Sequence, residues 1–480
     1  MLMRNLTMMT DLYQLTMMNG YFRYGKRDQV SVFDMFFRGH ALQEYAVMAG
    51  LEQVIEYIQN LHFNREDIEY LRSLNIFDED FLEYLRTFRF NGEIYAMPEG
   101  SIVFPQEPLV RVKAKIMEAQ FIETALLNII NHQTLIATKA RRVVQAAKGG
   151  SVLEFGLRRA QGPDAGILGA RAAVIGGCDA TSNVMTGQMF DIPVKGTHAH
   201  SWVMSFPDEL SAFRAYADVF PDGCMLLVDT YDTLKSGVPN AITCFKELRA
   251  KGYEPVGIRL DSGDLAYLSK KARQMLDAAG FPNAKIFASG DLDEDLIWDL
   301  NAQGACIDVW GVGTKLITSD GFTALGGVYK LSCEDENGTM VPKIKVSENP
   351  VKITNPGYKK VMRIYDNATN KAIADLIMLE EESVDESKPL TLFHPVDTWK
   401  KMTVTDFHTK ELLQPIFVDG KLVYQQPKLQ QICAFAREEM ESFWEEYRRL
   451  RNPHVYKVDL SQKLYDLKQE LLKKARNGKA

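Results

Sequence analysis

Short apolar runs alternate with helical patterns through the middle of the chain, and this alternation restricts the possible folds more than any other feature. Five of the runs are SVLEF (151–155), MLLVD (225–229), VGIRLD (256–261), KIFASGD (285–291) and IDVWGVGT (307–314). They recur at roughly 25–30-residue spacing, and the helical patterns between them close on Gly252, Gly280 and Gly304. This order predicts successive βα units with parallel strands.

The apolar runs end in polar residues or glycine, as at Glu154, Asp229 and Arg259. In a barrel of parallel strands such ends converge on one mouth, whereas in an open sheet they line a crevice. About six strands fit into this part of the chain, fewer than the eight of a full barrel. We therefore expect an irregular, incomplete α/β barrel over residues 146–324, with the active site in it.

The flanking regions have a different pattern. Strand-like and helical stretches alternate less regularly at 28–37, 41–60, 66–87, 92–115 and 118–147. Further strand-like stretches are GGVYKLS, PVKITN, KKVMRIYD and ADLIML. We expect an α+β sandwich domain over 1–145, completed by part of 325–392. Two amphipathic patterns in the tail predict a largely helical extension over 393–480.

Composition narrows the class of protein. Hydrophobic residues make up 46% and charged residues 25%, and 56 Lys and Arg against 63 Asp and Glu give a net charge of −7. This balance is typical of a soluble globular protein and argues against nucleic acid as the main partner. The six cysteines form no CxxC motif, which predicts reduced thiols. Without a signal peptide or membrane span in the sequence, we expect a cytoplasmic protein.

Paired arginines follow the first apolar run, in EFGLRRAQGPDAG (154–166). Arg158 and Arg159 suit phosphate or pyrophosphate, because a guanidinium group can hold two oxygens at once. A surface ion pair with Glu154 is the simpler alternative.

The turn IRLDSGDL (258–265) gathers Arg259, Asp261, Ser262 and Asp264. Carboxylates in such a turn can accept hydrogen bonds from sugar hydroxyls or hold Mg²⁺ through water. One acid can equally cap the next helix, so we expect one cap and one ligand.

Two glycine-rich turns follow later strands, in ASGDLDED (288–295) and WGVGTKL (310–316). Backbone N–H groups in such turns can cradle a phosphate. Neither turn matches the patterns of dinucleotide-binding folds or P-loop ATPases. Together, the polar strand ends predict a phosphate-bearing substrate.

Two of the eight histidines share the stretch KGTHAHSW (195–202). In an extended strand end, His198 and His200 would point to the same side and both face the mouth. No further ligands at matching spacing support a metal site. Near the N-terminus, TDLYQLTM (10–17) predicts a helix start with Tyr13 in its first turn, where core packing is the commoner role for an aromatic ring.

These motifs resemble, in order, those of the nicotinate phosphoribosyltransferase family. The set comprises TDLYQLTM, FDMFFR, EFGLRRAQGPDAG, GTHAHSW, VDTYDT, IRLDSGDL, ASGDLDE and WGVGTKL, and runs to about residue 400. The resemblance implies an α/β sandwich domain joined to an irregular α/β barrel. It also implies transfer of phosphoribose from phosphoribosyl pyrophosphate to nicotinate, giving nicotinate mononucleotide and pyrophosphate in NAD salvage, coupled to ATP hydrolysis.

The resemblance also implies roles for individual residues. Tyr13, Arg259 and Thr197 correspond to contacts of nicotinate. Arg158 and Arg159 correspond to a basic pair that faces phosphate groups.

Further roles follow in the same way. Asp261 corresponds to an acid near the ribose hydroxyls, and Gly313 and Thr314 to the turn at the 5-phosphate. His200 corresponds to the histidine that becomes phosphorylated. The family further implies Mg²⁺, held mainly by pyrophosphate and water, and a homodimer with shared active sites.

Three alternatives remain open from the sequence. The first is a nicotinamide or quinolinate phosphoribosyltransferase on a similar fold, although quinolinate, with two carboxylates, should need more cations. The second is a sensor of phosphoribosyl ligands without turnover. The third is an aldolase-type barrel, but no lysine stands in mid-strand and Lys315 lies in a turn.

Overall fold

The computed structural model describes residues 5–39 and 45–477 and divides into two compact units. The barrel unit comprises residues 136–323, and the sandwich unit comprises residues 1–135 and 324–480. The chain passes between them twice, within helix α6 (Glu123–Ala146) and between residues 323 and 324.

The barrel unit is built around a sheet of six parallel strands. They are β6 (Ser151–Glu154), β7 (Ala180–Thr181), β8 (Met225–Leu227), β9 (Gly257–Leu260), β10 (Lys285–Gly290) and β11 (Val309–Val312). Their order in the sheet is β7-β6-β11-β10-β9-β8. Read from β8, the strands follow chain order to β11 and continue with β6 and β7. That cyclic order is the order of a barrel, and no strand pairing joins β7 to β8 in the described residues. The predicted irregular, incomplete α/β barrel is therefore confirmed.

Side chains help to close the barrel where hydrogen bonds do not. Leu153, Ala180, Met225 and Phe287 form one buried cluster. Ala180 lies on β7 and Met225 on β8, the two strands at the open seam. Because inward-facing residues of a barrel fill its interior, this cluster holds the unpaired edges together through apolar packing.

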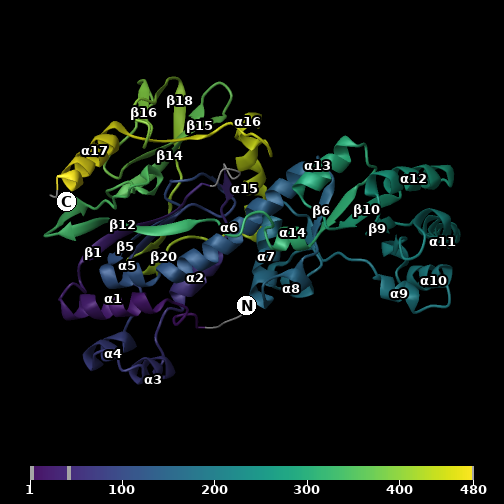
Figure 1. Ribbon diagram of the computed structural model, residues 1–480, viewed down its shortest axis with the longest axis horizontal. Helices are drawn as coiled ribbons and strands as arrows, with labels where there is room; N and C mark the ends of the chain where they lie inside the picture. The colour runs from purple at the N-terminus through teal and green to yellow at the C-terminus, as the bar shows by residue number, and fades with distance from the viewer. Residues whose placement is uncertain (1–4, 40–44, 478–480) are drawn as a thin grey trace. The chain divides into compact units, whose positions relative to one another are not determined.

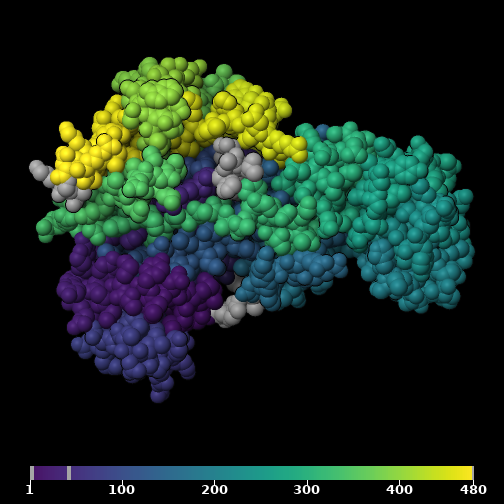
Figure 2. All heavy atoms as spheres, viewed as in Figure 1, coloured from purple at the N-terminus to yellow at the C-terminus, as the bar shows by residue number. Residues whose placement is uncertain are grey.

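The helices of the barrel unit follow the strands, as the sequence predicted (Figure 1). They are α7 (Pro163–Ile175), α8 (Val184–Phe190), α9 (His200–Met204), α10 (Glu209–Val219), α11 (Val238–Ala250), α12 (Leu265–Ala278), α13 (Glu294–Ala302) and α14 (Thr314–Ile317), with the 3₁₀ turns η1 (Leu157–Arg159) and η2 (Pro221–Gly223) and the π turn η3 (Thr233–Gly237). In Figure 2 the teal atoms of α9 to α12 form the outer surface at one side of this unit. The three glycines expected to end helices adopt positive φ angles just after α11, α12 and α13.

The sandwich unit contains a seven-stranded antiparallel sheet. In sheet order its strands are β13 (Thr339–Pro342), β12 (Gly327–Glu336), β1 (Val30–Phe37), β5 (Val110–Lys115), β3 (Glu93–Ala96), β19 (Gln414–Val418) and β20 (Lys421–Leu422). Its helices include α1 (Leu12–Arg23), α2 (Leu51–Gln59), α3 (Arg65–Ser73), α4 (Glu79–Arg86) and α5 (Ile116–Phe121), and β2 (Ala46–Val47) pairs with β4 (Ile102–Val103). Of the helical pattern expected at 41–60, residues 41–44 lie outside the described residues.

The C-terminal region differs from the predicted largely helical extension over 393–480. It contributes to a second sheet with the order β17 (Lys401–Val404), β16 (Leu390–Phe393), β21 (Lys457–Leu460), β15 (Ala372–Leu379), β14 (Lys359–Asp366), β18 (Phe407–Glu411). The predicted helices are present as α15 (Leu429–Glu441), α16 (Glu445–Arg448) and α17 (Gln462–Arg476). The stretch PVKITN was also wrong as a strand, because it begins with the 3₁₀ turn η4 (Pro350–Lys352).

A buried ion cluster explains why this region is part of the unit. Arg363 of β14 is fully buried and donates to Asp375 of β15 at 2.8 and 2.9 Å and to Glu439 of α15 at 2.8 Å. It also donates to the carbonyl oxygen of Ile102 on β4 at 2.7 Å. A buried guanidinium must keep its partners, because an unpaired buried charge costs several kcal/mol, roughly 3–5. The short tail strands, such as KMTV and FHTKE, are too polar to signal burial in the sequence.

Among the described helices, none has both the length and the apolar character that a membrane span requires.

Candidate active site

A cavity of about 600 Å³ opens at the carboxyl ends of the barrel strands. Its walls come from the ends of β6, β7, β9, β10 and β11 and from the segments that follow them. Seven of the predicted site residues line it: Arg158, Arg159, Thr197, Arg259, Asp261, Gly313 and Thr314. This volume lies within the usual range for small-ligand sites.

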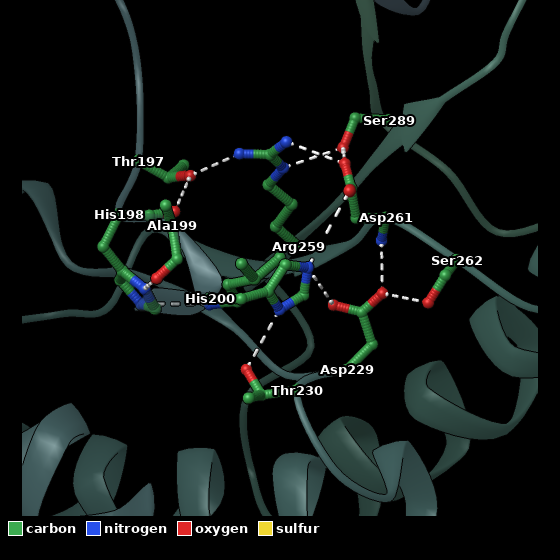
Figure 3. Close-up of polar contacts among 11 residues, drawn as sticks. Thr197, His198, Ala199, His200, Asp229, Thr230, Arg259, Asp261, Ser262 and Ser289 are labelled. Carbon is green, nitrogen blue, oxygen red and sulfur yellow. Dashed lines mark hydrogen bonds and ion pairs between the residues drawn. The ribbon is translucent and has the colours of Figure 1, made fainter. Parts of the chain in front are cut away.

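Arg259 on β9 is the best-anchored cation of the cavity (Figure 3). Its guanidinium group donates to the hydroxyls of Ser289 at 2.7 Å and Thr197 at 2.8 Å, and to the Asp261 carboxylate at 2.8 Å. Only 17% of its side chain is exposed. Three of its five N–H donors are engaged in this way, which leaves two for an anion in the cavity.

The Asp261 carboxylate is held in its charged form. Burial alone would raise the pKa of Asp261, but the hydrogen bond from Ser289 and the charge of Arg259 outweigh it and lower that pKa. Ser289 and Arg259 donate to the same oxygen, Oδ1. Asp264, three residues later, accepts from the backbone N–H of Tyr267 at 2.9 Å and caps α12. The predicted cap is therefore confirmed as Asp264, and the ligand role of Asp261 stays a prediction.

An aromatic ring that the sequence reasoning missed forms one wall. Phe155 follows β6 and lines the cavity, its ring centroid 5.7 Å from the Arg259 guanidinium carbon. It stacks on Phe287 with a centroid distance of 5.7 Å. A Cβ atom at Gly311 would lie within 3.0 Å of both rings, so glycine is required there to leave room. The available signal was the residue after Glu154 in EFGLRR, which ends the apolar run SVLEF.

Arg158 and Arg159 lie in the turn η1 at the cavity and are exposed. Their alternative role, a surface ion pair with Glu154, is wrong. Glu154 is fully buried, and its two carboxylate oxygens accept from Gly156 and Thr181. In the part of the chain that the structure describes, neither arginine forms an ion pair, so both are free to meet an anion.

The glycine-rich turn after β11 forms the neighbouring wall, because β11 pairs with β6. Gly313 and Thr314 line the cavity, and Gly313 precedes the first residue of α14. A Cβ atom at Gly313 would lie 3.2 Å from the carbonyl oxygen of Phe155, a contact that leaves little room for a side chain. Lys315 is held outside this lining by Asp293, at 2.5 Å.

The two histidines of KGTHAHSW have different environments. The segment is not an extended strand end, because residues 195–199 lack regular structure and α9 begins at His200. His198 is buried, and its Nε2 accepts from the backbone N–H of Leu227 at 3.2 Å. Burial lowers the pKa of His198 to about 4. His198 is therefore a neutral core histidine, and the assumption that both side chains face the mouth is wrong.

His200 lies beside the cavity without lining it. Its Nδ1 is 3.1 Å from the hydroxyl of Thr230. Its Nε2 lies 3.9 Å from Asp229 Oδ1 and 3.8 Å from Asp261 Oδ2, and 39% of the side chain is exposed. The ring thus faces two carboxylates and remains accessible, an arrangement suited to a nucleophile or base.

Asp229 is a second residue that we did not assign to the site. Its side chain is only 2% exposed. Oδ2 accepts from the backbone N–H of Asp261 at 2.9 Å and from the hydroxyl of Ser262 at 2.6 Å, while Oδ1 is buried without a hydrogen bond. It ties the turn after β9 to the end of β8 and faces His200 (Figure 3). Its place at a strand end, in MLLVD, was the available signal.

Tyr13 belongs to the sandwich unit and does not line the cavity. It lies in the first turn of α1, as predicted, and 47% of it is exposed. Core packing, the commoner role, is therefore wrong for Tyr13. Within the described ranges, no three His, Cys, Asp or Glu side chains are grouped to hold a metal ion.

The neutral state of His198 leads to a prediction for stability. Because its folded pKa of about 4 lies below the usual 6.5, its contribution to stability is complete above pH 6.5 and is lost as pH falls toward 4. In His198→Gln, the amide oxygen can accept the Leu227 N–H without titrating. As the pH falls from 6.5 to 4, the free energy of unfolding should decrease more steeply in the wild type than in the variant. The difference between the two slopes should be up to about 1.4 kcal/mol per pH unit. Urea denaturation at several pH values measures the difference, and parallel curves would contradict the prediction.

Comparisons with known proteins are specific. A model of the N-terminal domain of nicotinate phosphoribosyltransferase matches residues 8–131, and a model of its C-terminal domain matches residues 358–468. The nicotinate phosphoribosyltransferase of Bacillus subtilis strain 168 is 50% identical over 467 residues, covering 97% of this chain and 95% of that protein. The one from Caenorhabditis elegans is 37% identical over 522 residues, covering 95% and 92%. A crystal structure of human nicotinic acid phosphoribosyltransferase matches with a TM-score of 0.84 and 31% identity, covering 96% of this chain and 99% of that one.

Proposed function

The chain belongs to the nicotinate phosphoribosyltransferase family, and from this we propose that it transfers phosphoribose from phosphoribosyl pyrophosphate to nicotinate. The products are nicotinate mononucleotide and pyrophosphate, and the reaction serves NAD salvage. The observation that carries the proposal is the position of the Arg259 guanidinium group. Three partners hold it beside the Phe155 ring, in a cavity whose glycine-rich turns suit phosphate.

The acceptor can lie against Phe155 with its carboxylate directed at Arg259. Nicotinate is a flat pyridine ring with one carboxylate, and the two free N–H donors of Arg259 suit that carboxylate. Phe155 offers a π face for stacking. A neutral amide such as nicotinamide would leave the two free N–H donors of Arg259 without a charged acceptor, so the site favours the acid.

The donor fits the remaining walls. Arg158 and Arg159 can hold pyrophosphate oxygens, and the N–H groups of the turn at Gly313 and Thr314 suit the 5-phosphate. Asp261, kept ionised, is suited to accept from the ribose hydroxyls.

The transfer itself needs no protein nucleophile. The pyridine nitrogen attacks C1 of the ribose as pyrophosphate leaves, and positive charge builds on the ribose ring. The protein acts by positioning the two substrates and by electrostatic stabilisation. The Asp261 carboxylate, whose lowered pKa keeps it negative, stabilises that charge.

We propose Mg²⁺ as a cofactor, because the family implies it and the cavity offers carboxylates. Asp261 and Asp291 line the cavity and offer the carboxylate oxygens that Mg²⁺ prefers. Because these two aspartates could supply only part of the coordination shell of Mg²⁺, pyrophosphate and water would supply most of its ligands. When bound, the ion neutralises charge on the leaving pyrophosphate.

Coupling to ATP is proposed through His200. Its imidazole nitrogen would accept the γ-phosphoryl group of ATP with release of ADP, and hydrolysis of the phosphoramidate would return the free histidine and phosphate. The partly exposed ring beside Asp261 supports this role. Phosphorylation would add negative charge next to the donor site and thereby change how tightly substrates and products bind.

A homodimer with shared active sites is the proposed assembly. Tyr13 is one of several large apolar side chains exposed on α1, with Leu12 and Met17. An aromatic ring on such a face is available to a second copy, which supports its proposed role at the nicotinate of the partner's barrel.

Asp261→Asn tests the electrostatic role. Removing the charge should lower kcat/KM for both substrates by about 10²–10³-fold, because the developing positive charge loses a carboxylate that stabilises it. The matched control is Asp264→Asn, three residues away, where the amide can still cap α12. Steady-state kinetics and thermal unfolding measure both variants. Wild-type kinetics in Asp261→Asn would remove this residue from the site.

A product assay tests the function as a whole. The chain is incubated with phosphoribosyl pyrophosphate, Mg²⁺ and either nicotinate, nicotinamide or quinolinate, each with and without ATP. Mass spectrometry should detect nicotinate mononucleotide from nicotinate, in larger yield with ATP. Mononucleotide formation from nicotinamide or quinolinate at an equal rate, or from none of the three, would contradict the proposal.

A further inference from the structure

A buried carboxyl group lies directly behind the cavity without a cationic partner. Glu154, the last residue of β6, is fully buried. One carboxylate oxygen accepts from the backbone N–H of Gly156, and the other accepts from the hydroxyl of Thr181 at 2.6 Å. In the described ranges no Lys, Arg or His side chain bonds to it. Burying a carboxyl group in this way is costly unless its hydrogen bonds are retained.

Thr181, also fully buried, connects the carboxyl group to two further segments. Its hydroxyl oxygen accepts from the N–H of Asn183 at 3.0 Å, and its carbonyl oxygen accepts from the N–H of Lys195 at 3.0 Å. The carbonyl oxygen of Glu154 accepts from the N–H of Ser182 at 2.9 Å. Glu154 and Thr181 therefore join three stretches of chain that are far apart in sequence.

Each of these stretches carries a wall of the cavity. The turn that follows Glu154 carries Arg158 and Arg159. Ser182 lines the cavity from the end of β7. The segment after Lys195 carries Thr197, which accepts from Arg259. A displacement at Glu154 or Thr181 would thus move the arginine pair and the Arg259 clamp together.

The turn after β6 has little freedom to compensate. A Cβ atom at Gly156 would lie 2.4 Å from Cβ of Ile317 and 2.9 Å from Oε1 of Glu154, so this turn is packed tightly on both sides. Burial raises the pKa of Glu154, and the bonds from Thr181 and Gly156 offset part of that rise.

We propose that Glu154 and Thr181 are positioning residues that set the affinity of the cavity for the phosphoribosyl donor, by holding the Arg158–Arg159 turn and the Thr197 segment in register. This inference rests on the proposed function for its substrate. Neither side chain touches the substrate; both act through the residues that they hold.

Thr181→Val tests the proposal because valine keeps the shape and removes the hydroxyl. We expect KM for phosphoribosyl pyrophosphate to rise about tenfold, since a buried acceptor loses its donor, with kcat changed much less. Thr181→Ser keeps the hydroxyl and should restore most of the affinity. The matched control is Thr186→Val on α8, which removes another fully buried hydroxyl, bonded only to the Ile167 carbonyl oxygen at 3.3 Å.

Amide hydrogen exchange supplies a readout without substrate. Peptides covering 155–160 and 194–199 should exchange faster in Thr181→Val than in the wild type or Thr186→Val. Unchanged exchange, or an equal rise in KM in the two valine variants, would overturn the positioning role. Absence of nicotinate mononucleotide in the wild type would instead refute the proposed function, while the exchange comparison still decides whether these residues hold the two segments.

Discussion

His200→Ala is expected to abolish ATP hydrolysis and the stimulation of transfer by ATP, while a slow ATP-independent transfer survives. The loss should be at least about 10²-fold in the ATP-dependent rate, because no other side chain replaces the nucleophile. The cavity keeps its walls in this variant, since His200 does not line it. The fold should also remain, because the ring is partly exposed and makes one side-chain hydrogen bond, with Thr230.

The phosphorylated group can be identified directly. Incubation with γ-labelled ATP should give an acid-labile, base-stable label on the wild type and none on His200→Ala. Ser201→Ala is the matched control, because Ser201 is the next residue of α9, is exposed and carries a hydroxyl. Its label should equal that of the wild type. A label that persists in His200→Ala would refute the assignment.

Arg259→Ala should have the second large effect, on the choice of acceptor. A buried guanidinium that loses its anion, or an anion that loses its guanidinium, costs on the order of 2–5 kcal/mol. We therefore expect KM for nicotinate to rise by about 10²-fold or more, with a smaller rise for phosphoribosyl pyrophosphate. The preference for nicotinate over nicotinamide should decrease by a similar factor, because the neutral amide does not form an ion pair with Arg259.

The geometry adds a second consequence for this variant. Arg259 is a partner of Asp261, and without that charge the pKa of Asp261 should rise toward its ordinary value. The acidic limb of the pH–rate profile should then move to higher pH, because protonated Asp261 cannot stabilise the ribose charge. Arg249→Ala is the control: it removes an exposed arginine at the end of α11 that pairs with Glu254. Equal loss of affinity for both substrates in Arg259→Ala would mean a structural role.

Much of the barrel could be read from the sequence because its signals are local. Apolar runs such as MLLVD, and helices closed by glycine at Gly252 or Gly280, report burial and backbone conformation within a few residues. The tail strands were missed for the opposite reason. KMTV and FHTKE are short and polar, and become strands only because β16 and β14 supply their hydrogen-bonding partners.

Site residues divide in the same way. Arg259, Asp261 and Gly313 stand at strand ends, where parallel topology alone brings side chains together. Phe155 and Asp229 also stand at strand ends. Their residue types do not show whether Phe155 forms a cavity wall or part of the core, or whether Asp229 faces His200. Only the packing of Phe287 and Gly311 against Phe155 exposes that difference.

The histidines of KGTHAHSW show where sequence and tertiary structure divide the decision. The sequence by itself determined that two imidazoles stand two residues apart near a strand end, and the family motif singled out His200. Which ring is buried was decided by the start of α9 at His200 and by the Leu227 N–H that His198 accepts. Burial and hydrogen-bond partners come from segments about 30 residues away, and they set the protonation and reactivity of a histidine; no local pattern encodes them.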